Sequence, residues 1–155
     1  MRRLLPLVAT MLIAAVVVGT TTLVGGAGSG AESFTVVSTS QHFQEIDVGA
    51  AGESPGDYFI ETDVLWNEAE TDRVGSNVVK CTLDFGTTAI CTVAFRYFGR
   101  GQLTGTGLVD FTSQSFSFPI TGGTRDFQDV TGQARVTFES QERATLQFHL
   151  SGTAA

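Results

Sequence analysis

The most informative stretch of the sequence is Phe118-Pro-Ile-Thr-Gly-Gly-Thr-Arg-Asp-Phe-Gln-Asp-Val-Thr-Gly132. It places a glycine pair between two segments rich in β-forming residues. Because glycine adopts positive φ at little cost, we expect a sharp turn at Gly122-Gly123. Phe127 falls inside the connection, where an apolar ring is expected to cover the end of a hydrophobic core. The stretch therefore predicts a strand, a connection that plugs one end of a core, and a return strand.

Eight segments after residue 31 are rich in Val, Ile, Thr or aromatic residues, and they alternate in places between apolar and polar positions. Clusters of Gly, Asp, Asn and Thr separate them, and none has helical periodicity. Eight short antiparallel strands predict an all-β, up-and-down barrel, in which closure removes both exposed edges; a two-sheet sandwich is the alternative. The predicted strands are Phe34–Gln44, Asp57–Trp66, Val74–Asp84, Thr88–Phe98, Gln102–Phe111, Ser115–Thr121, Asp129–Glu139 and Thr145–Leu150.

The first 31 residues have the features of a secretory signal peptide. Arg2 and Arg3 precede an apolar run from Leu4 to Val18, and a series of small residues follows. An uncleaved membrane anchor is the alternative, because the apolar run can be extended to Val24, which is about long enough to cross a bilayer. If the signal peptide is cleaved, we expect residues 32–155 to form a single domain of a secreted or cell-envelope-exposed protein that has no membrane contact.

The charge of the chain limits its partners. It has 9 Lys and Arg residues against 16 Asp and Glu residues, a formal net charge of −7. Without Arg2 and Arg3 the balance is 7 against 16, or −9. Nucleic acids and anionic membranes are disfavoured partners, because both require basic patches. The two histidines, His42 and His149, lie far apart in the sequence, and the acids lack calcium-loop spacing, so we expect neither a metal nor a cofactor.

Cys81 and Cys91 are the only cysteines. A disulfide is expected in an exported protein, and two buried thiols are the alternative. Each cysteine lies five residues from Gly86, so a hairpin turn centred on Gly86 would place them directly opposite each other. The alternation of this hairpin also predicts its inward face, which comprises Val79, Cys81, Leu83, Cys91, Val93, Phe95 and Tyr97.

Two acids on the second predicted strand need an explanation. Glu61 and Asp63 share a strand face with Phe59, and a carboxylate on an apolar face is costly to bury unless it is paired or its pKa rises. If this face points into the barrel, Asp63 is a candidate acid, base or polar anchor. If the other face points inward, both acids are solvated. The alternation of the strand leaves both arrangements open.

At this point the chain resembles the allene oxide cyclase barrel superfamily, which includes plant dirigent proteins and bacterial spirotetronate cyclases. The resemblance covers about residues 56–152 and implies an eight-stranded barrel with an apolar lumen that commonly self-associates as a dimer or trimer. It rests on motifs in the order of the family: Gly56-Asp-Tyr-Phe-Ile-Glu-Thr-Asp-Val-Leu-Trp66, Arg73-Val-Gly75, the Cys81 strand, Arg96-Tyr-Phe-Gly99, Gly105-x-Gly107, Ile120-Thr-Gly-Gly-Thr-Arg-Asp-Phe127 and Val130-x-Gly132.

The resemblance also implies a site. It favours Asp63 pointing into the lumen, because the position corresponds to a polar lumenal residue of the cyclases and to one aspartate of the dirigent Asp-Asp pair. Glu45-Ile-Asp47 is similar to the Glu-Ile-Asn of the cyclase site, which makes Glu45 a second catalytic candidate and Asp47 a substrate-binding one. The expected aromatic wall comprises Phe59, Phe95, Tyr97, Phe116 and Phe118.

The implied function is that of a cofactor-independent cyclase or isomerase. Such a barrel would fold a small hydrophobic substrate in its lumen for stereoselective ring closure, by epoxide cyclisation or pericyclic cycloaddition. The alternative is a non-catalytic barrel that binds a hydrophobic ligand or acts in the dirigent manner, because one fold can carry unrelated functions.

Overall fold

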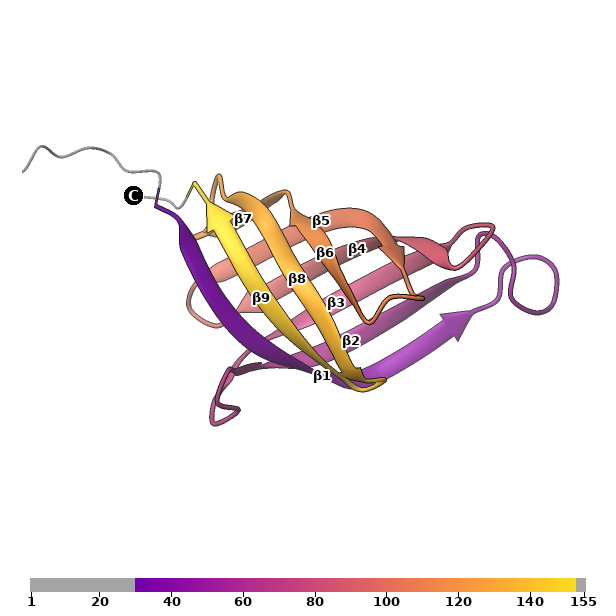
Figure 1. Cartoon of the computed structure of the whole chain (residues 1–155), viewed down its shortest axis with the longest axis horizontal. Coiled ribbons are helices and arrows are strands. Elements are labelled where there is room, and N and C mark those ends of the chain that lie inside the picture. The colour runs from indigo at the N-terminus through magenta and orange to yellow at the C-terminus, as the bar shows by residue number, and fades with distance from the viewer. Residues whose placement is uncertain (1–29, 153–155) are drawn as a thin grey trace, which may run out of the picture.

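The computed structural model describes residues 30–152, which form nine antiparallel β-strands rolled into a nearly closed barrel (Figure 1). The predicted all-β barrel is therefore confirmed. The predicted signal peptide lies, except for its last two residues, outside the described residues. Within residues 30–152 no helix has the length and hydropathy needed to cross a membrane.

One continuous sheet makes the barrel, in the strand order β6-β8-β9-β1-β2-β3-β4-β5-β7. Sequential strands mostly pair with their neighbours, as short connections favour. The strands are β1 (Glu32–Ile46), β2 (Tyr58–Asn67), β3 (Arg73–Leu83), β4 (Thr88–Tyr97), β5 (Gly101–Asp110), β6 (Ser115–Ile120), β7 (Gly122–Arg125), β8 (Thr131–Ser140) and β9 (Arg143–Ser151).

The barrel closes through one strand that is split in two. β6 pairs with β8, and β7 pairs with β5, so the chain changes partner at Thr121. Pro119 has no N–H that could donate a hydrogen bond to β5. β6 nevertheless packs closely against β5, because a Cβ at Gly105 would lie 2.1 Å from the Pro119 carbonyl oxygen. The Thr121 N–H donates to the Thr104 carbonyl at 2.9 Å and completes the seam.

The structure corrects two details of the expected connection. It contains a ninth strand, β7, where the sequence predicted only a loop. The expected sharp turn at Gly122-Gly123 is wrong, because neither glycine has positive φ. Gly123 instead gives room for Phe127, whose Cβ would lie 2.6 Å from a Cβ at position 123. The positive φ values fall later, at Arg125 and Asp129, which flank Phe127 in the chain.

Both termini of the described chain lie at one end of the barrel (Figure 1), and aromatic rings fill this end. Phe127 is fully buried there, as its place in the connection predicted. Its ring contacts that of Tyr97, and the Phe148 ring stacks on that of Phe34. The Arg100 guanidinium lies over the Phe127 ring at 4.6 Å. We call this the closed end.

The opposite end is open because β1 extends beyond the end of its pairing with β9. The pairing of β1 with β9 ends at Thr39, whereas β1 stays paired with β2 as far as Ile46. A register shift between Ser40 and His42 marks a bulge, which bends β1. Figure 1 shows this second half of β1 leaving the turn between β8 and β9 and running on to the right. The wall of the barrel therefore lacks one side at this end.

The hairpin of β3 and β4 has the predicted register. Cys81 lies directly opposite Cys91, and the two form a disulfide, as expected from their spacing about Gly86. Both cysteines, together with Val93 and Phe95, point inward and are almost completely buried. The disulfide is thus part of the inner wall.

Candidate functional site

The lumen contains an inner cavity of about 110 Å³. Most of its wall is apolar, and four of the five rings predicted to form the wall line it. These four rings are Phe59, Phe95, Phe116 and Phe118. Phe111 and Phe138, which the sequence did not single out, add two further rings near the open end.

Asp63 is the more deeply buried of the two acids that line this cavity. Its face of β2 points inward, so the structure places it as the resemblance favoured, and the residue is only 9% exposed. The Ser38 hydroxyl donates to Asp63 Oδ2 at 2.6 Å. The Asn77 amide donates to Ser38 Oγ at 3.5 Å, and Asn77 is also the register partner of Asp63. Asp63 Oδ1 and Asn77 Oδ1 have no hydrogen-bond partner among the described residues.

Burial changes the proton affinity of both lumenal acids. It raises the pKa of Asp63, while the Ser38 and Asn77 side chains act in the opposite direction. Burial also raises the pKa of Glu61, the Ser40 side chain opposes this, and the negative charge of Asp63 raises the pKa further. The two acids are two residues apart on β2 and line the same cavity. Each therefore holds a proton to higher pH than a solvated carboxyl does.

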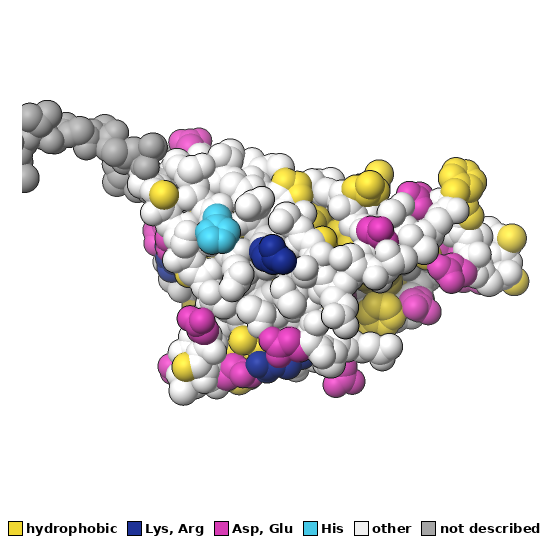
Figure 2. All heavy atoms as spheres, in the orientation of Figure 1, with side chains coloured by type: hydrophobic (Ala, Val, Ile, Leu, Met, Phe, Trp, Pro, Cys, Tyr) yellow, Lys and Arg dark blue, Asp and Glu magenta, His cyan; other side chains and the backbone are white. Residues whose placement is uncertain are grey.

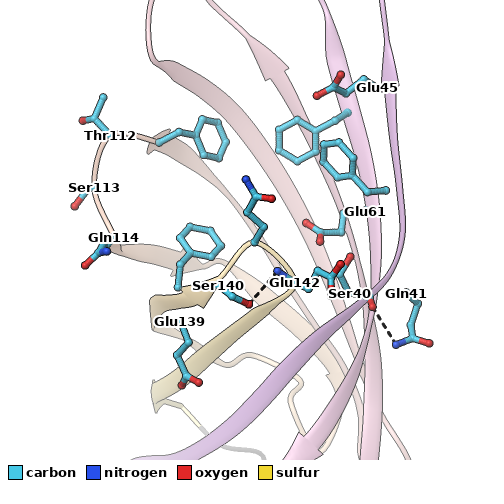
Figure 3. A pocket seen from close by; sticks show the side chains of 15 residues that line it. Ser40, Gln41, Glu45, Glu61, Thr112, Ser113, Gln114, Glu139, Ser140 and Glu142 are labelled. Carbon is cyan, nitrogen blue, oxygen red and sulfur yellow. Dashed lines mark hydrogen bonds between the residues drawn. The ribbon is translucent and has the colours of Figure 1, made fainter.

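A wider hollow of about 940 Å³ continues from the cavity to the surface (Figure 3). The inner cavity and the hollow share Phe59, Glu61, Phe111 and Phe138. The wall of the hollow comes from the second half of β1, the connection between β5 and β6, and the turn between β8 and β9. In Figure 3 the carboxyl groups of Glu45 and Glu61 point into the hollow. The two spaces thus form a funnel with Asp63 in its narrow part.

The remaining predicted site residues do not join Asp63. Glu45 lies at the rim opposite Phe59, four residues along β2 from Asp63, which corresponds to about 13 Å. Asp47 is exposed beyond β1, where its Oδ2 accepts a hydrogen bond from the Gly52 N–H at 3.0 Å. Tyr97 is at the closed end, and its buried hydroxyl has no partner among the described residues. Glu61, not Glu45, is the acid nearest to Asp63 along the wall.

Ser38 and Asn77 are the polar partners that the sequence analysis missed. The inward orientation of Asn77 could have been predicted, because Asn77 lies two residues before Val79 on the predicted inward face of its strand. Ser38 had no comparable signal: its contact with Asp63 depends on the register between β1 and β2. A cluster of three or more His, Cys, Asp or Glu side chains suited to a metal does not occur in the described part of the chain.

Comparisons with known proteins agree on the fold. A scan against models of protein families gives no match, and a search of curated proteins finds no significant relative. Among solved structures, pyocyanin demethylase superposes with a TM-score of 0.69 at 21% identity, covering 77% of this chain and 99% of that one. The Diels-Alderase AbmU from Streptomyces koyangensis gives 0.66 at 14% identity, covering 84% of this chain and 72% of that one.

The pterocarpan synthase dirigent protein GePTS1 gives a TM-score of 0.67 at 14% identity and covers 94% of this chain and 100% of that chain. The predicted resemblance to the cyclase and dirigent barrels is therefore confirmed at the level of the fold. Such low identities carry no information about activity, which has to be argued from the site.

Proposed function

We propose that this protein is a cofactor-independent cyclase or isomerase that binds a small hydrophobic substrate in the funnel and promotes stereoselective ring closure. The observation that carries the proposal is Asp63: a carboxyl group that is only 9% exposed, has one oxygen without a partner among the described residues, and lines a mostly apolar cavity. Buried polar groups in folded proteins are nearly always paired, so an unpaired one at a cavity wall indicates a group that acts on a ligand.

The proposed chemistry needs no redox partner, because an intramolecular ring closure conserves atoms and electrons. In an epoxide cyclisation, Asp63 Oδ1 would take the proton of an attacking O–H or N–H group. The new bond to carbon forms as the carbon–oxygen bond of the epoxide breaks, and the proton then passes to the epoxide oxygen. In a cycloaddition, the apolar wall would hold the reacting ends together and lower the entropic part of the barrier. The raised pKa of Asp63 means that this carboxyl group exchanges protons at a higher pH than a solvated aspartate does.

A non-catalytic barrel is the second candidate, and the narrowness of the inner cavity favours it. About 110 Å³ holds little more than one small ring, so much of a substrate would sit in the outer hollow. A dirigent-type or carrier protein would use the same funnel to bind or orient a molecule without converting it. The two functions differ in whether the bound molecule is changed.

Recovery of the bound molecule separates these functions. Small molecules that co-purify with the full chain are extracted and identified by mass spectrometry, then returned to the purified protein. A cyclase converts the molecule into a product of the same mass and different retention time, whereas a binding protein returns it unchanged.

Two matched variants check that the lumen is the binding site. Ala144 lines the inner cavity, so Ala144→Leu should abolish co-purification. Ala94 is exposed on β4, so Ala94→Leu should have no effect. Equal recovery from both variants, or recovery of nothing from the parent chain, would contradict the proposal.

We also propose that the protein works outside the cytoplasm, secreted or exposed at the cell envelope. The signal-like N-terminus and the Cys81–Cys91 disulfide support this, because structural disulfides persist in oxidising compartments. Cell fractionation tests it directly.

A further inference from the structure

With Asp63 and Glu61 ionised, the described residues that line the inner cavity offer hydrogen-bond acceptors to a ligand and no free donor. Its polar lining residues are Ser38, Glu61 and Asp63. The Ser38 hydroxyl already donates to Asp63 Oδ2, while Asp63 Oδ1 has no partner. A ligand that satisfies this oxygen has to bring an N–H or O–H group of its own, because a ligand acceptor placed there would leave two oxygens facing each other.

The charge along the funnel selects further between such ligands. Among the described residues, those that line the outer hollow include Glu45, Glu61, Glu139 and Glu142 and no Lys, Arg or His. Glu139 forms an ion pair with Arg143, and in Figure 3 its carboxyl group points away from the hollow. Figure 2 shows acidic side chains among the hydrophobic ones at the open end. The remaining acids place a negative potential along the entry path, which attracts cations and repels anions.

Resting on the function proposed above, we infer that the ligand of the funnel is a hydrophobic molecule with a basic nitrogen, and that its ammonium or protonated heterocyclic N–H binds Asp63 Oδ1. The apolar part of the ligand contacts Phe95, Phe116 and Phe118, and Glu61 lies on the entry side of the charged nitrogen. A charge-assisted hydrogen bond in this mostly apolar cavity is stronger than one to a neutral hydroxyl. A carboxylate ligand of the same shape is excluded by the acids.

A series of three probes with one apolar body tests this inference. The probes are 3-phenylpropylamine, 3-phenylpropanol and 3-phenylpropanoate, which present an ammonium, a hydroxyl and a carboxylate at neutral pH. Their affinities are measured by isothermal titration calorimetry with the purified protein. We expect the amine to bind at least about tenfold more tightly than the alcohol, and the carboxylate to bind more weakly than both.

Three variants locate the effect. Asp63→Asn should weaken amine binding about tenfold and change alcohol binding less than about threefold. Glu61→Gln should weaken amine binding in the same direction. Asp126→Asn is the matched control, because it removes one negative charge from an exposed side chain that precedes Phe127 of the closed end in the chain, and it should leave all three affinities unchanged.

Two results would overturn the inference in different ways. Equal affinities for the three probes, or tightest binding of the carboxylate, would disprove the preference for a basic nitrogen but would still be consistent with a hydrophobic site in the lumen. No binding of any probe would contradict the lumenal site itself, and with it both the inference and the proposed function.

Discussion

Asp63 and Asn77 are direct neighbours across β2 and β3, yet each keeps one buried side-chain oxygen without a hydrogen-bond partner within residues 30–152. Leaving a buried acceptor unsatisfied costs about 1–3 kcal/mol, so this pair is unfavourable for the folded protein alone. The Ser38 hydroxyl pairs with only one oxygen of Asp63. The free protein therefore loses some stability by keeping this acceptor unpaired, and a ligand in the lumen can supply the missing hydrogen bond.

Replacing Asp63 by Asn should stabilise the protein and impair its function. The variant has nearly the same volume, loses the buried negative charge, and gains an N–H₂ that can donate to Asn77 Oδ1. We expect the free energy of unfolding in urea to rise by about 1 kcal/mol while turnover or ligand affinity falls. Asp126→Asn at the closed end should change neither quantity. A destabilised Asp63→Asn protein would contradict the arrangement described for this pair.

The stability gained by Asp63→Asn should depend on pH. Because burial raises the pKa of Asp63 in the folded state above its ordinary value, the folded state binds the proton more tightly than the unfolded state. The wild type therefore loses stability as the pH rises from the ordinary value of Asp through the raised one. The advantage of the variant should be small at about pH 4 and larger at about pH 8. Glu61, the other acid of the cavity, is present in both proteins, so the difference isolates Asp63 and its effect on Glu61. An advantage that is constant or shrinks with pH would show that Asp63 is not desolvated.

Several features were predictable because they depend on local sequence. The inward face containing Phe95 follows from the alternation of the hairpin, and the disulfide follows from the spacing of the cysteines about Gly86 and from the expected export of the protein. The inward orientation of Asp63 needed the resemblance, since alternation left both faces open. The change of strand partner at Thr121 depends on contact between Pro119 and Gly105, which are distant in sequence. The open end of the barrel could not be predicted from the sequence either, because its position depends on where β9 stops pairing with β1.

Gly105 should be essential for closing the barrel. A Cβ at this position would lie 2.1 Å from the Pro119 carbonyl oxygen and 2.8 Å from a carbon of the Phe118 ring. We expect Gly105→Ala to destabilise the fold by at least about 2 kcal/mol in urea unfolding, because β6 has to move away from β5. Gly122→Ala is the control, since nothing lies within 4 Å of its Cβ position, and it should change stability by less than about 0.5 kcal/mol. Equal effects of the two substitutions would show that the seam is not tightly packed.

Reducing the Cys81–Cys91 disulfide should lower stability by about 2–3 kcal/mol, the range expected for a short closed loop. Urea unfolding with and without reductant measures the loss, and intact mass after alkylation counts the thiols. The double variant Cys81→Ala/Cys91→Ala serves as a control that should not respond to reductant. Two free thiols in protein recovered from an oxidising compartment would contradict the bond.

The outer face of the barrel should mediate self-association as a dimer or trimer. Ile90 and Leu108 lie directly opposite each other on β4 and β5 and are 58% and 64% exposed. Light scattering should give a multiple of the monomer mass for the wild type, and the monomer mass for Ile90→Thr/Leu108→Thr. Phe85→Ser is a suitable control, because Phe85 is exposed in the hairpin turn outside this face. A wild type that stays monomeric at high micromolar concentration would count against the proposal.

Nuclear magnetic resonance shows most directly whether a ligand binds in the lumen against Asp63. Protein labelled at Asp carboxyl carbons and at Val and Leu methyl groups is titrated with 3-phenylpropylamine. We expect saturable shifts of the Asp63 carboxyl signal and of the methyl signals of Val93, Val136 and Leu146, which line the inner cavity, while those of Val78 and Leu108 on the outer face stay in place. Shifts confined to the outer face, or an Asp63 signal that does not move as the probe saturates, would contradict it.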